Sequence, residues 1–363
     1  MSDQRTQHKV VVWGTGNVGR TALRTVLAHR DLELVDVVVN NPDKVGRDAG
    51  TLAEIDPVGV LATNDAAAVL ERRPDAVVYA ASGDTRPDDA LADILDCLRA
   101  GASVTTPAIY ALLHPATSNE RLLAKVNAAC AEGGSSLYVS GIDPGWAQDI
   151  LPLLVSGVAG QMDEIRVQEL FDYSTYNAPE IVREVIGFGK PMDYLPPMLI
   201  PSVPTMIWGP MIHTMADGLG VTIDDIEESV ERLALDAPVD TVQGRFDEGT
   251  QGAFRFEVRG IVDGESRLVV EHITRIAPHL APDWPTPAAG KTGEHRLIIE
   301  GRPRIEMSIH ATDDSDNPAD GGNATAAARL VNAVPAVIGA DNRVLGTLDL
   351  PPVVGGGLGQ TIS

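Results

Sequence analysis

The sequence predicts an α/β protein: an N-terminal domain with a doubly wound parallel sheet, followed by a second, α+β domain built on an antiparallel sheet. Three observations support this prediction. The glycines Gly14, Gly16 and Gly19 separate an apolar run from an amphipathic segment, strands and helices alternate as far as residue 140, and two hairpin patterns occur later in the chain. A chain of 363 residues is long enough to form two domains.

The stretch of residues 10–30 is predicted to form a buried strand, a tight turn and a helix. In the G-x-G-x-x-G spacing the first glycine permits the bend, the second lets backbone amides approach a pyrophosphate, and the third lets helix and strand pack closely. The helix N-terminus favours an anion. The pattern is typical of a Rossmann-type dinucleotide site, although an ordinary strand-to-helix turn is the alternative. The predicted cofactor contacts are Gly14, Thr15, Gly16, Asn17, Val18 and Gly19.

The second strand indicates which dinucleotide binds. An enzyme that prefers NAD usually has an acidic residue at the end of this strand, to bind the ribose hydroxyls. Here Asp36 lies in mid-strand, and the strand ends at Asn40 and Asn41. With Lys44 and Arg47 following, this end tolerates a 2′-phosphate and offers positive charge. The sequence therefore predicts NADP, with NAD possible, unless Lys44 and Arg47 are ordinary solvated loop residues.

The β-α alternation continues beyond the second strand. Strands are predicted at 75–81, 102–105 and 136–140, and helices at 65–72, 87–99 and 119–132. Ligands of doubly wound sheets bind beyond the carboxyl ends of the strands. The residues predicted to lie near the nicotinamide are therefore Ala81, Ser82, Gly83 and Thr106. We assign residues 1–145 to the dinucleotide-binding domain.

A different pattern begins at Trp146. Residues 254–260 alternate, turn at Asp263-Gly264 and return over 267–276, and a further alternating pair flanks Gly301-Arg302. The antiparallel sheet built from these hairpins is a plausible dimer surface. Additional elements are predicted as helices at 146–155, 178–186 and 205–219, and a strand at 164–171. We assign residues 146–322 to a substrate-binding and dimerisation domain, and residues 323–363 to a C-terminal helix and tail that return to the first domain.

Charge and composition exclude several classes of function. With 28 Lys and Arg against 51 Asp and Glu, the formal charge of -23 repels nucleic acids and anionic membranes. No apolar run reaches the ~18 residues of a membrane span, and the N-terminus lacks the apolar stretch of a signal peptide, so a cytoplasmic location is expected. Cys97 and Cys130 lack metal-ligand spacing and are predicted to be core residues. No metal site is predicted.

Several motifs, spread over most of the chain, resemble the dihydrodipicolinate-reductase-like dehydrogenases, the group that includes 2,4-diaminopentanoate dehydrogenase and the native amine dehydrogenases. The resemblance implies NADP- or NAD-dependent hydride transfer at a carbon bearing an amine or imine, or its carbonyl counterpart, in a homodimer with the site between domains and a small-molecule substrate. The motifs are GTGNVGR, NNPDKVGRDAG, SGIDPGWAQDILPLLVSG, REVIGFGKPMDYL, MADGLGVTIDDIEE, ARLVNAVPAVIGA and LDLPPVV.

Two departures from the family narrow this expectation. The paired-histidine and lysine motif of true dihydrodipicolinate reductases, with its Ser-Gly-Thr loop, has no counterpart here, so that activity is rejected. Native amine dehydrogenases place an acidic residue after the fifth strand to hold the substrate amine. This sequence has TTPAIY at 105–110, without Asp or Glu. The missing acidic residue therefore favours a neutral ketone, alcohol or cyclic imine as the substrate.

The candidate proton-handling residues are Asp143, Tyr173 and His213. Each has a structural alternative: Asp143 as the cap of the following helix, Tyr173 as a buried ring with one hydroxyl partner, and His213 as a core histidine. A further group of aromatic side chains would form an apolar substrate pocket or part of a core. These residues are Tyr110, Trp146, Tyr176, Phe188 and Trp208.

We therefore predict an NADP-preferring oxidoreductase that transfers a hydride between the nicotinamide and a small, fairly apolar amine, imine or ketone. One alternative is a carbonyl or cyclic-imine reductase without amine specificity. An acidic, dipicolinate-like substrate would require a basic pair such as Arg183 and Lys190 at the site. Another alternative is a non-catalytic NADP-binding sensor.

Overall fold

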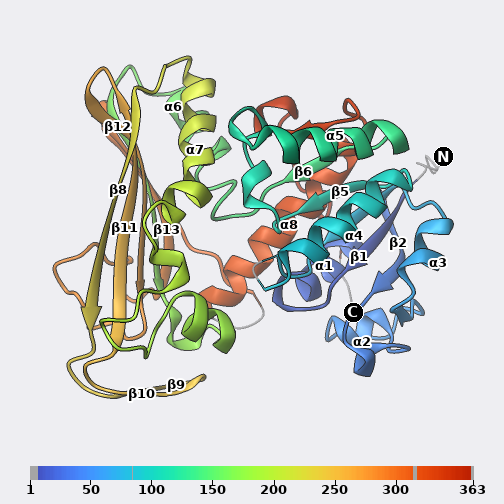
Figure 1. The fold of residues 1–363 in the computed structure, drawn as a ribbon, viewed down its shortest axis with the longest axis horizontal. Helices are drawn as coiled ribbons and strands as arrows, with labels where there is room; N and C mark the ends of the chain where they lie inside the picture. Colours follow the sequence, from blue (N-terminus) through green and yellow to red (C-terminus); the bar gives the residue numbers. More distant parts are fainter. Residues whose placement is uncertain (1–6, 84, 314–316, 361–363) are drawn as a thin grey trace. The chain divides into compact units, whose positions relative to one another are not determined.

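A computed structural model describes residues 7–83, 85–313 and 317–360, and its chain divides into two compact units. Unit 1 comprises residues 1–142 and 323–363, and unit 2 comprises residues 143–322. Each unit contains its own sheet (Figure 1). Among the described residues, no helix is both long enough and apolar enough to cross a membrane.

Unit 1 contains a seven-stranded parallel sheet in the order β15-β6-β5-β4-β1-β2-β3. The order reverses between β1 and β4, which is the point where ligands bind in this class of fold. Its strands are β1 (His8–Trp13), β2 (Leu32–Val38), β3 (Ala62–Thr63), β4 (Ala76–Tyr79), β5 (Ser103–Thr106), β6 (Leu137–Val139) and β15 (Val344–Leu345), and its helices are α1 (Asn17–Ala28), α2 (Ala49–Leu52), α3 (Ala66–Glu71), α4 (Pro87–Arg99) and α5 (Glu120–Gly133).

Helix α8 (Pro318–Ile338) brings the end of the chain back to this sheet. Its residues Leu330 and Val334 share an apolar core with Leu23 of α1 and with Val10 and Val12 of β1. On the opposite face, Tyr79 of β4 donates a hydrogen bond to Asp93 of α4. The parallel sheet is thus covered by helices on both faces, as its apolar strands require. Cys97 and Cys130 are buried free thiols in this unit.

Unit 2 is built on a six-stranded sheet in the order β14-β13-β7-β12-β11-β8. Helix α7 packs on one face of it. The strands are β7 (Gln161–Asp172), β8 (Asp225–Ala234), β11 (Gln251–Val262), β12 (Glu265–Arg275), β13 (Gly293–Arg302) and β14 (Ile305–Ile309), the helices are α6 (Ile150–Ser156) and α7 (Val203–Leu219), and a small hairpin joins β9 (Val239–Thr241) to β10 (Gly244–Phe246).

The predicted α+β second domain is confirmed, with three differences in detail. Strand β7 pairs in parallel with β12, so the sheet is mixed, while its other pairings are antiparallel. The segment predicted as a helix at 178–186 forms a single wide turn over Ile181–Val185. Strand β8 was not predicted, because its charged residues alternate along an exposed edge of the sheet.

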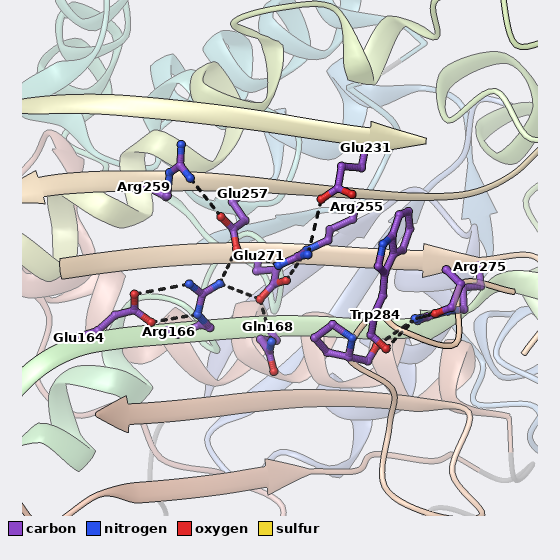
Figure 2. Close-up of polar contacts among 12 residues, drawn as sticks. Glu164, Arg166, Gln168, Glu231, Arg255, Glu257, Arg259, Glu271, Arg275 and Trp284 are labelled. Atoms are coloured by element: carbon purple, nitrogen blue, oxygen red, sulfur yellow. Dashed lines mark hydrogen bonds and ion pairs between the residues drawn. The ribbon is translucent and has the colours of Figure 1, made fainter. Parts of the chain in front are cut away.

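The two faces of this sheet differ sharply in chemistry. Alternation along the strands places Phe256, His272, Glu169 and His295 opposite one another on four neighbouring strands, on the face that carries α7. The residues one step away point to the other face. There, charged side chains of β7, β11 and β12 form a connected ion-pair network around Glu271 (Figure 2).

Candidate active site

The three glycines of the turn in unit 1 have distinct backbone environments. Gly14 has a positive φ of 96°, and a Cβ there would lie 2.7 Å from the backbone nitrogen of Ala81. A Cβ on Gly19 would lie 2.0 Å from the carbonyl oxygen of Gly14. Gly16, in contrast, has open space around it and precedes α1 without a side-chain cap. Of the three glycines, only Gly16 therefore leaves room beside the backbone, at the position where a pyrophosphate approaches in this class of fold.

The remaining residues predicted around the cofactor gather at the same edge of the sheet. The loops that follow β4 and β5 touch, because a Cβ on Gly83 would lie 2.0 Å from the carbonyl oxygen of Ala108. Thr106 is fully buried, and its hydroxyl accepts a hydrogen bond from the Ala108 amide at 3.0 Å. Ser82 is exposed beside them. The ends of β1, β4 and β5 thus form one continuous rim.

The end of β2 lacks an acidic ribose ligand. Asp36 is bound to Arg72 by two hydrogen bonds, at 2.6 and 3.0 Å. Lys44 reaches the glycine turn, where its Nζ lies 2.8 Å from the carbonyl oxygen and 3.0 Å from the hydroxyl of Thr15. Asn40 and Asn41 are exposed, and Asn41 caps the short helical turn that contains Lys44. The ammonium group of Lys44 therefore lies at the glycine turn, and the neutral residues Asn40 and Asn41 lie at the end of β2.

Unit 2 contains a buried polar cluster at the end of β7, made of Asp143, Glu169, Tyr173, His272 and His295. Nε2 of His272 lies 2.7 Å from one carboxylate oxygen of Glu169, and Nε2 of His295 lies 3.8 Å from the other. Tyr173 donates a hydrogen bond to Glu169 at 3.2 Å. The Asp143 and Glu169 side chains are hydrogen-bonded to each other, which requires a shared proton.

Two further side chains hold Asp143 in place. The indole nitrogen of Trp208 donates to one carboxyl oxygen at 2.6 Å, and the side-chain amide of Gln148 donates to the other at 2.5 Å. Helix α6 begins only at Ile150, and Asp149 provides its N-cap. The alternative role of Asp143 as the cap of that helix is therefore wrong, and its carboxyl group belongs to the polar cluster.

Aromatic rings surround the imidazole of His272. Its ring centroid lies 5.4 Å from Trp208, 5.8 Å from Phe254 and 5.1 Å from Phe256. Aromatic faces carry partial negative charge and attract cations. Both Glu169 and this aromatic shell thus favour positive charge at the same place.

The environment separates the protonation states of the two carboxyl groups. Burial and the charge of Glu169 raise the pKa of Asp143 well above its usual value. Burial opposes ionisation of Glu169 as well, but His272, His295 and the bond to Asp143 outweigh it and lower the pKa of Glu169 to about 2. Burial lowers the pKa of His272, yet Glu169 raises it overall. Near neutral pH, Asp143 is therefore a proton donor and Glu169 an anion.

The donor atoms of Asp143, Glu169 and His272 lie within 4.8 Å of one another, a spacing that a metal ion can also use. The sequence did not predict this cluster, because its members are far apart in the chain. A metal ion would stand ~2.0–2.2 Å from each donor and between them. Here the donors instead contact one another directly. This arrangement is suited to sharing a proton.

The other predicted site residues are distributed as follows. Tyr176 packs against Tyr173 with ring centroids 4.9 Å apart, and it therefore lies beside the cluster. Phe188 is fully buried and packs on Phe254, as expected of a core residue. His213 is half-buried on α7, five residues after Trp208, so it lies on another side of the helix from the contact of Trp208 with Asp143. Trp146 and Tyr110 are half-buried.

The basic pair that an acidic substrate would require is engaged elsewhere. Lys190 bonds both carboxylate oxygens of Glu184 at 2.8 Å. Arg183 donates to the carbonyl oxygens of Gln243 and Arg245 and lies 4.1 Å from the ring centroid of Phe246. These contacts disfavour a dicarboxylic substrate.

Sequence reasoning missed Glu169 and His272, the centre of the cluster. Both lie in segments that were predicted as strands, and each is a buried polar residue next to a second one, Gln168 beside Glu169 and Glu271 beside His272. This was the one available signal, since a buried unpaired charge is costly and implies a partner. The identity of the partner depends on the pairing of β7 with β12, which no local pattern specifies.

Comparisons with known proteins agree with this architecture. Family models described as "Dihydrodipicolinate reductase, N-terminus" and "2,4-diaminopentanoate dehydrogenase C-terminal domain" match residues 8–88 and 147–357. An amine dehydrogenase of Streptomyces virginiae is 56% identical over 95% of this chain and 97% of its own. The 2,4-diaminopentanoate dehydrogenase of Acetoanaerobium sticklandii is 23% identical over 94% and 93%. The structure of an amine dehydrogenase from Mycobacterium smegmatis matches with a TM-score of 0.76 at 20% identity, over 96% and 97% of the two chains.

The doubly wound domain with its glycine turn and the second domain with its buried proton-sharing cluster define an oxidoreductase of the dehydrogenase class. Within that class, the chain belongs to the dihydrodipicolinate-reductase-like family that contains the amine dehydrogenases and 2,4-diaminopentanoate dehydrogenase. The resemblance predicted from the motifs is confirmed. The alternative of a non-catalytic sensor is set aside.

Proposed function

We propose that this oxidoreductase transfers a hydride between NADP and a small, fairly apolar amine or imine. One observation carries the proposal: a glycine turn in which only Gly16, of the three glycines, has open space around it occurs in a chain that is 56% identical to an amine dehydrogenase over 95% of its length. When bound, the nicotinamide supplies or accepts the hydride. The residues proposed to hold the dinucleotide are the glycine turn, Asn40, Asn41, Lys44 and the rim formed by Ala81, Ser82, Gly83 and Thr106.

The preference for NADP is supported by Lys44, whose ammonium group stands at the glycine turn while Asp36 is occupied by Arg72. Replacing Lys44 by alanine should raise the Kd for NADPH by about tenfold or more, because a charge-assisted bond to the 2′-phosphate contributes ~1.5–3 kcal/mol. The Kd for NADH should change less than about twofold, since NADH lacks that phosphate. Titration by protein fluorescence measures both. Lys125→Ala, at an exposed position on α5, is the matched control and should leave both Kd values unchanged. An equal loss of affinity for both dinucleotides in the Lys44 variant would contradict the role of Lys44.

For the protein's part in the chemistry, we propose that Asp143 and Tyr173 handle protons at the substrate nitrogen. Both belong to the cluster around Glu169, and both residues keep part of their surface exposed. A proton donor must lie within hydrogen-bond reach of the reacting group, and the pKa of Asp143 is raised enough for it to donate. His213 lies on α7 five residues after Trp208, on another side of the helix from the contact of Trp208 with Asp143, and is the weaker candidate.

The proposal is tested by following NADPH formation at 340 nm with matched substrates. A small primary amine on a secondary carbon should reduce NADP, whereas the alcohol of the same carbon skeleton should give less than about a tenth of that rate, because the carboxylate of Glu169 favours a cation over a neutral hydroxyl. A carbonyl or cyclic-imine reductase without amine specificity remains the second candidate, favoured by the absence of an acidic residue at 105–110. Equal rates with amine and alcohol would support it and contradict the proposal.

The family resemblance also implies a homodimer. The sheet of unit 2 offers a face for such an interface. This face carries the ion-pair network drawn in Figure 2, whereas α7 packs on the other face of the sheet. Light scattering of the purified protein determines the oligomeric state.

A further inference from the structure

The polar cluster of unit 2 is built to hold a single positive charge. Glu169 is 7% exposed and contacts two imidazoles and a phenol. Three aromatic rings surround His272 on the other side. Moreover, Nε2 of the buried His295 points toward Glu169 without a hydrogen-bond partner among the described residues. A buried carboxylate beside aromatic rings is a favourable environment for a cation.

We propose that Glu169 is the carboxylate that pairs with the substrate's ammonium or iminium nitrogen, and that His272 carries the compensating proton when no substrate is bound. The proposal rests on the proposed amine oxidation. It accounts for the missing acidic residue at 105–110, since the counterion of the amine is supplied from β7 of the second unit. Glu169 is thus a catalytic residue, and His295 a positioning residue.

The chemistry balances with one proton and one hydride. The bound substrate, a primary ammonium ion on a secondary carbon, loses one N–H proton to neutral His272, by way of the carboxyl pair of Asp143 and Glu169. The C–H bond of the neutral amine then breaks, its electron pair leaves with the hydrogen as hydride to the oxidised nicotinamide, and the nitrogen lone pair turns the C–N bond into the C=N bond of an iminium cation. Water hydrolyses this iminium to the ketone and ammonium. Glu169 faces a cationic nitrogen before and after the step, and His272 ends protonated.

This exchange predicts a specific dependence on pH. His272 faces Glu169 from β7, Asp143 from the loop before α6, His295 from β13 and Trp208 from α7. Protonated His272 repels the substrate ammonium, so kcat/KM for amine oxidation falls on the acid side of the pKa of His272. Glu169 raises that pKa. Removing the charge of Glu169 should therefore lower this pKa. The fall in kcat/KM at acid pH, the acid limb of the pH profile, should then move to lower pH by about one unit or more.

The deciding experiment compares Glu169→Gln with the wild type, with Glu265→Gln as an exposed control on β12. E169Q should lower kcat/KM for the amine on the order of 100-fold and move the acid limb to lower pH. Its Kd for NADPH should stay within about twofold, because unit 1 holds the dinucleotide. E265Q should match the wild type in all three measurements. An E169Q enzyme with wild-type kcat/KM and an unmoved acid limb overturns the proposal.

Two further variants keep the test decisive if E169Q does not fold. His272→Gln should abolish the acid limb, and Tyr173→Phe should lower kcat/KM while leaving the position of the limb unchanged. An acid limb that persists in H272Q overturns the assignment of His272. If the wild type oxidises no amine at all, the proposed function fails. If the wild type and E169Q oxidise amines equally well, the proposed function stands and the role of Glu169 fails.

Discussion

Replacing Gly16 by valine should raise the Kd for NADPH on the order of 100-fold while leaving the fold intact. Gly16 has an extended conformation that valine adopts easily, with φ at -78°, and nothing lies within 4 Å of a Cβ placed on it. The added methyl groups therefore enter only the space that we assign to the pyrophosphate. Loss of the glycine at the N-cap of α1 should cost no more than ~1 kcal/mol. Fluorescence titration and a thermal melt measure the two effects.

Gly355→Val is a matched control for this prediction, because Gly355 is exposed and has open space around it as well. That variant should bind NADPH like the wild type. In contrast, any side chain at Gly19 would meet the carbonyl oxygen of Gly14 and disturb folding itself. A folded G16V protein with wild-type affinity for NADPH would show that the pyrophosphate lies elsewhere.

The second large effect is expected for stability. Replacing Glu271 by alanine should destabilise unit 2 by about 3–5 kcal/mol, the usual cost of leaving buried charges without their partner. Glu271 is 1% exposed and bonds Arg166 at 2.8 Å, Arg255 at 2.7 Å and Gln168 at 2.7 Å (Figure 2). Its removal leaves two guanidinium groups with fewer anions, although Glu257 still contacts both. Urea unfolding followed by circular dichroism measures the loss.

The control for Glu271 lies on the same strand. Glu265 pairs with Arg267 at 2.9 Å, but the Glu265 side chain is largely in solvent, so Glu265→Ala should cost less than ~1 kcal/mol. A similar, small loss for both variants would mean that the network in Figure 2 contributes little to the stability of the sheet.

The sequence was most informative where structure is local. The strand, turn and helix at the N-terminus follow from an apolar run, three glycines and an amphipathic segment, and the hairpin of β11 and β12 follows from alternation around Asp263-Gly264. Long helices such as α4 and α7 were predicted close to their observed bounds. Short or irregular elements were not predicted correctly. The wide turn at 181–185 has the composition of a helix, and β15 is two residues long.

The candidate site could be predicted only in part, for a physical reason. Asp143 and Tyr173 lie in loops next to strand ends, where functional residues are expected. Glu169 and His272 lie within strands, and only the parallel pairing of β7 with β12, about a hundred residues apart, makes them neighbours. The register of the sheet, which is not encoded locally, decides that His272 meets the carboxylate of Glu169.

The most direct test of the account is the oxidation of NADPH by the wild-type enzyme with a small ketone, in the presence and absence of ammonia at one pH. If the enzyme acts on amines and imines, absorbance at 340 nm should fall only when ammonia is present, and the amine should appear in an amount equal to the NADPH consumed. Turnover of the ketone at the same rate without ammonia, with the alcohol as product, would contradict the account and identify a carbonyl reductase.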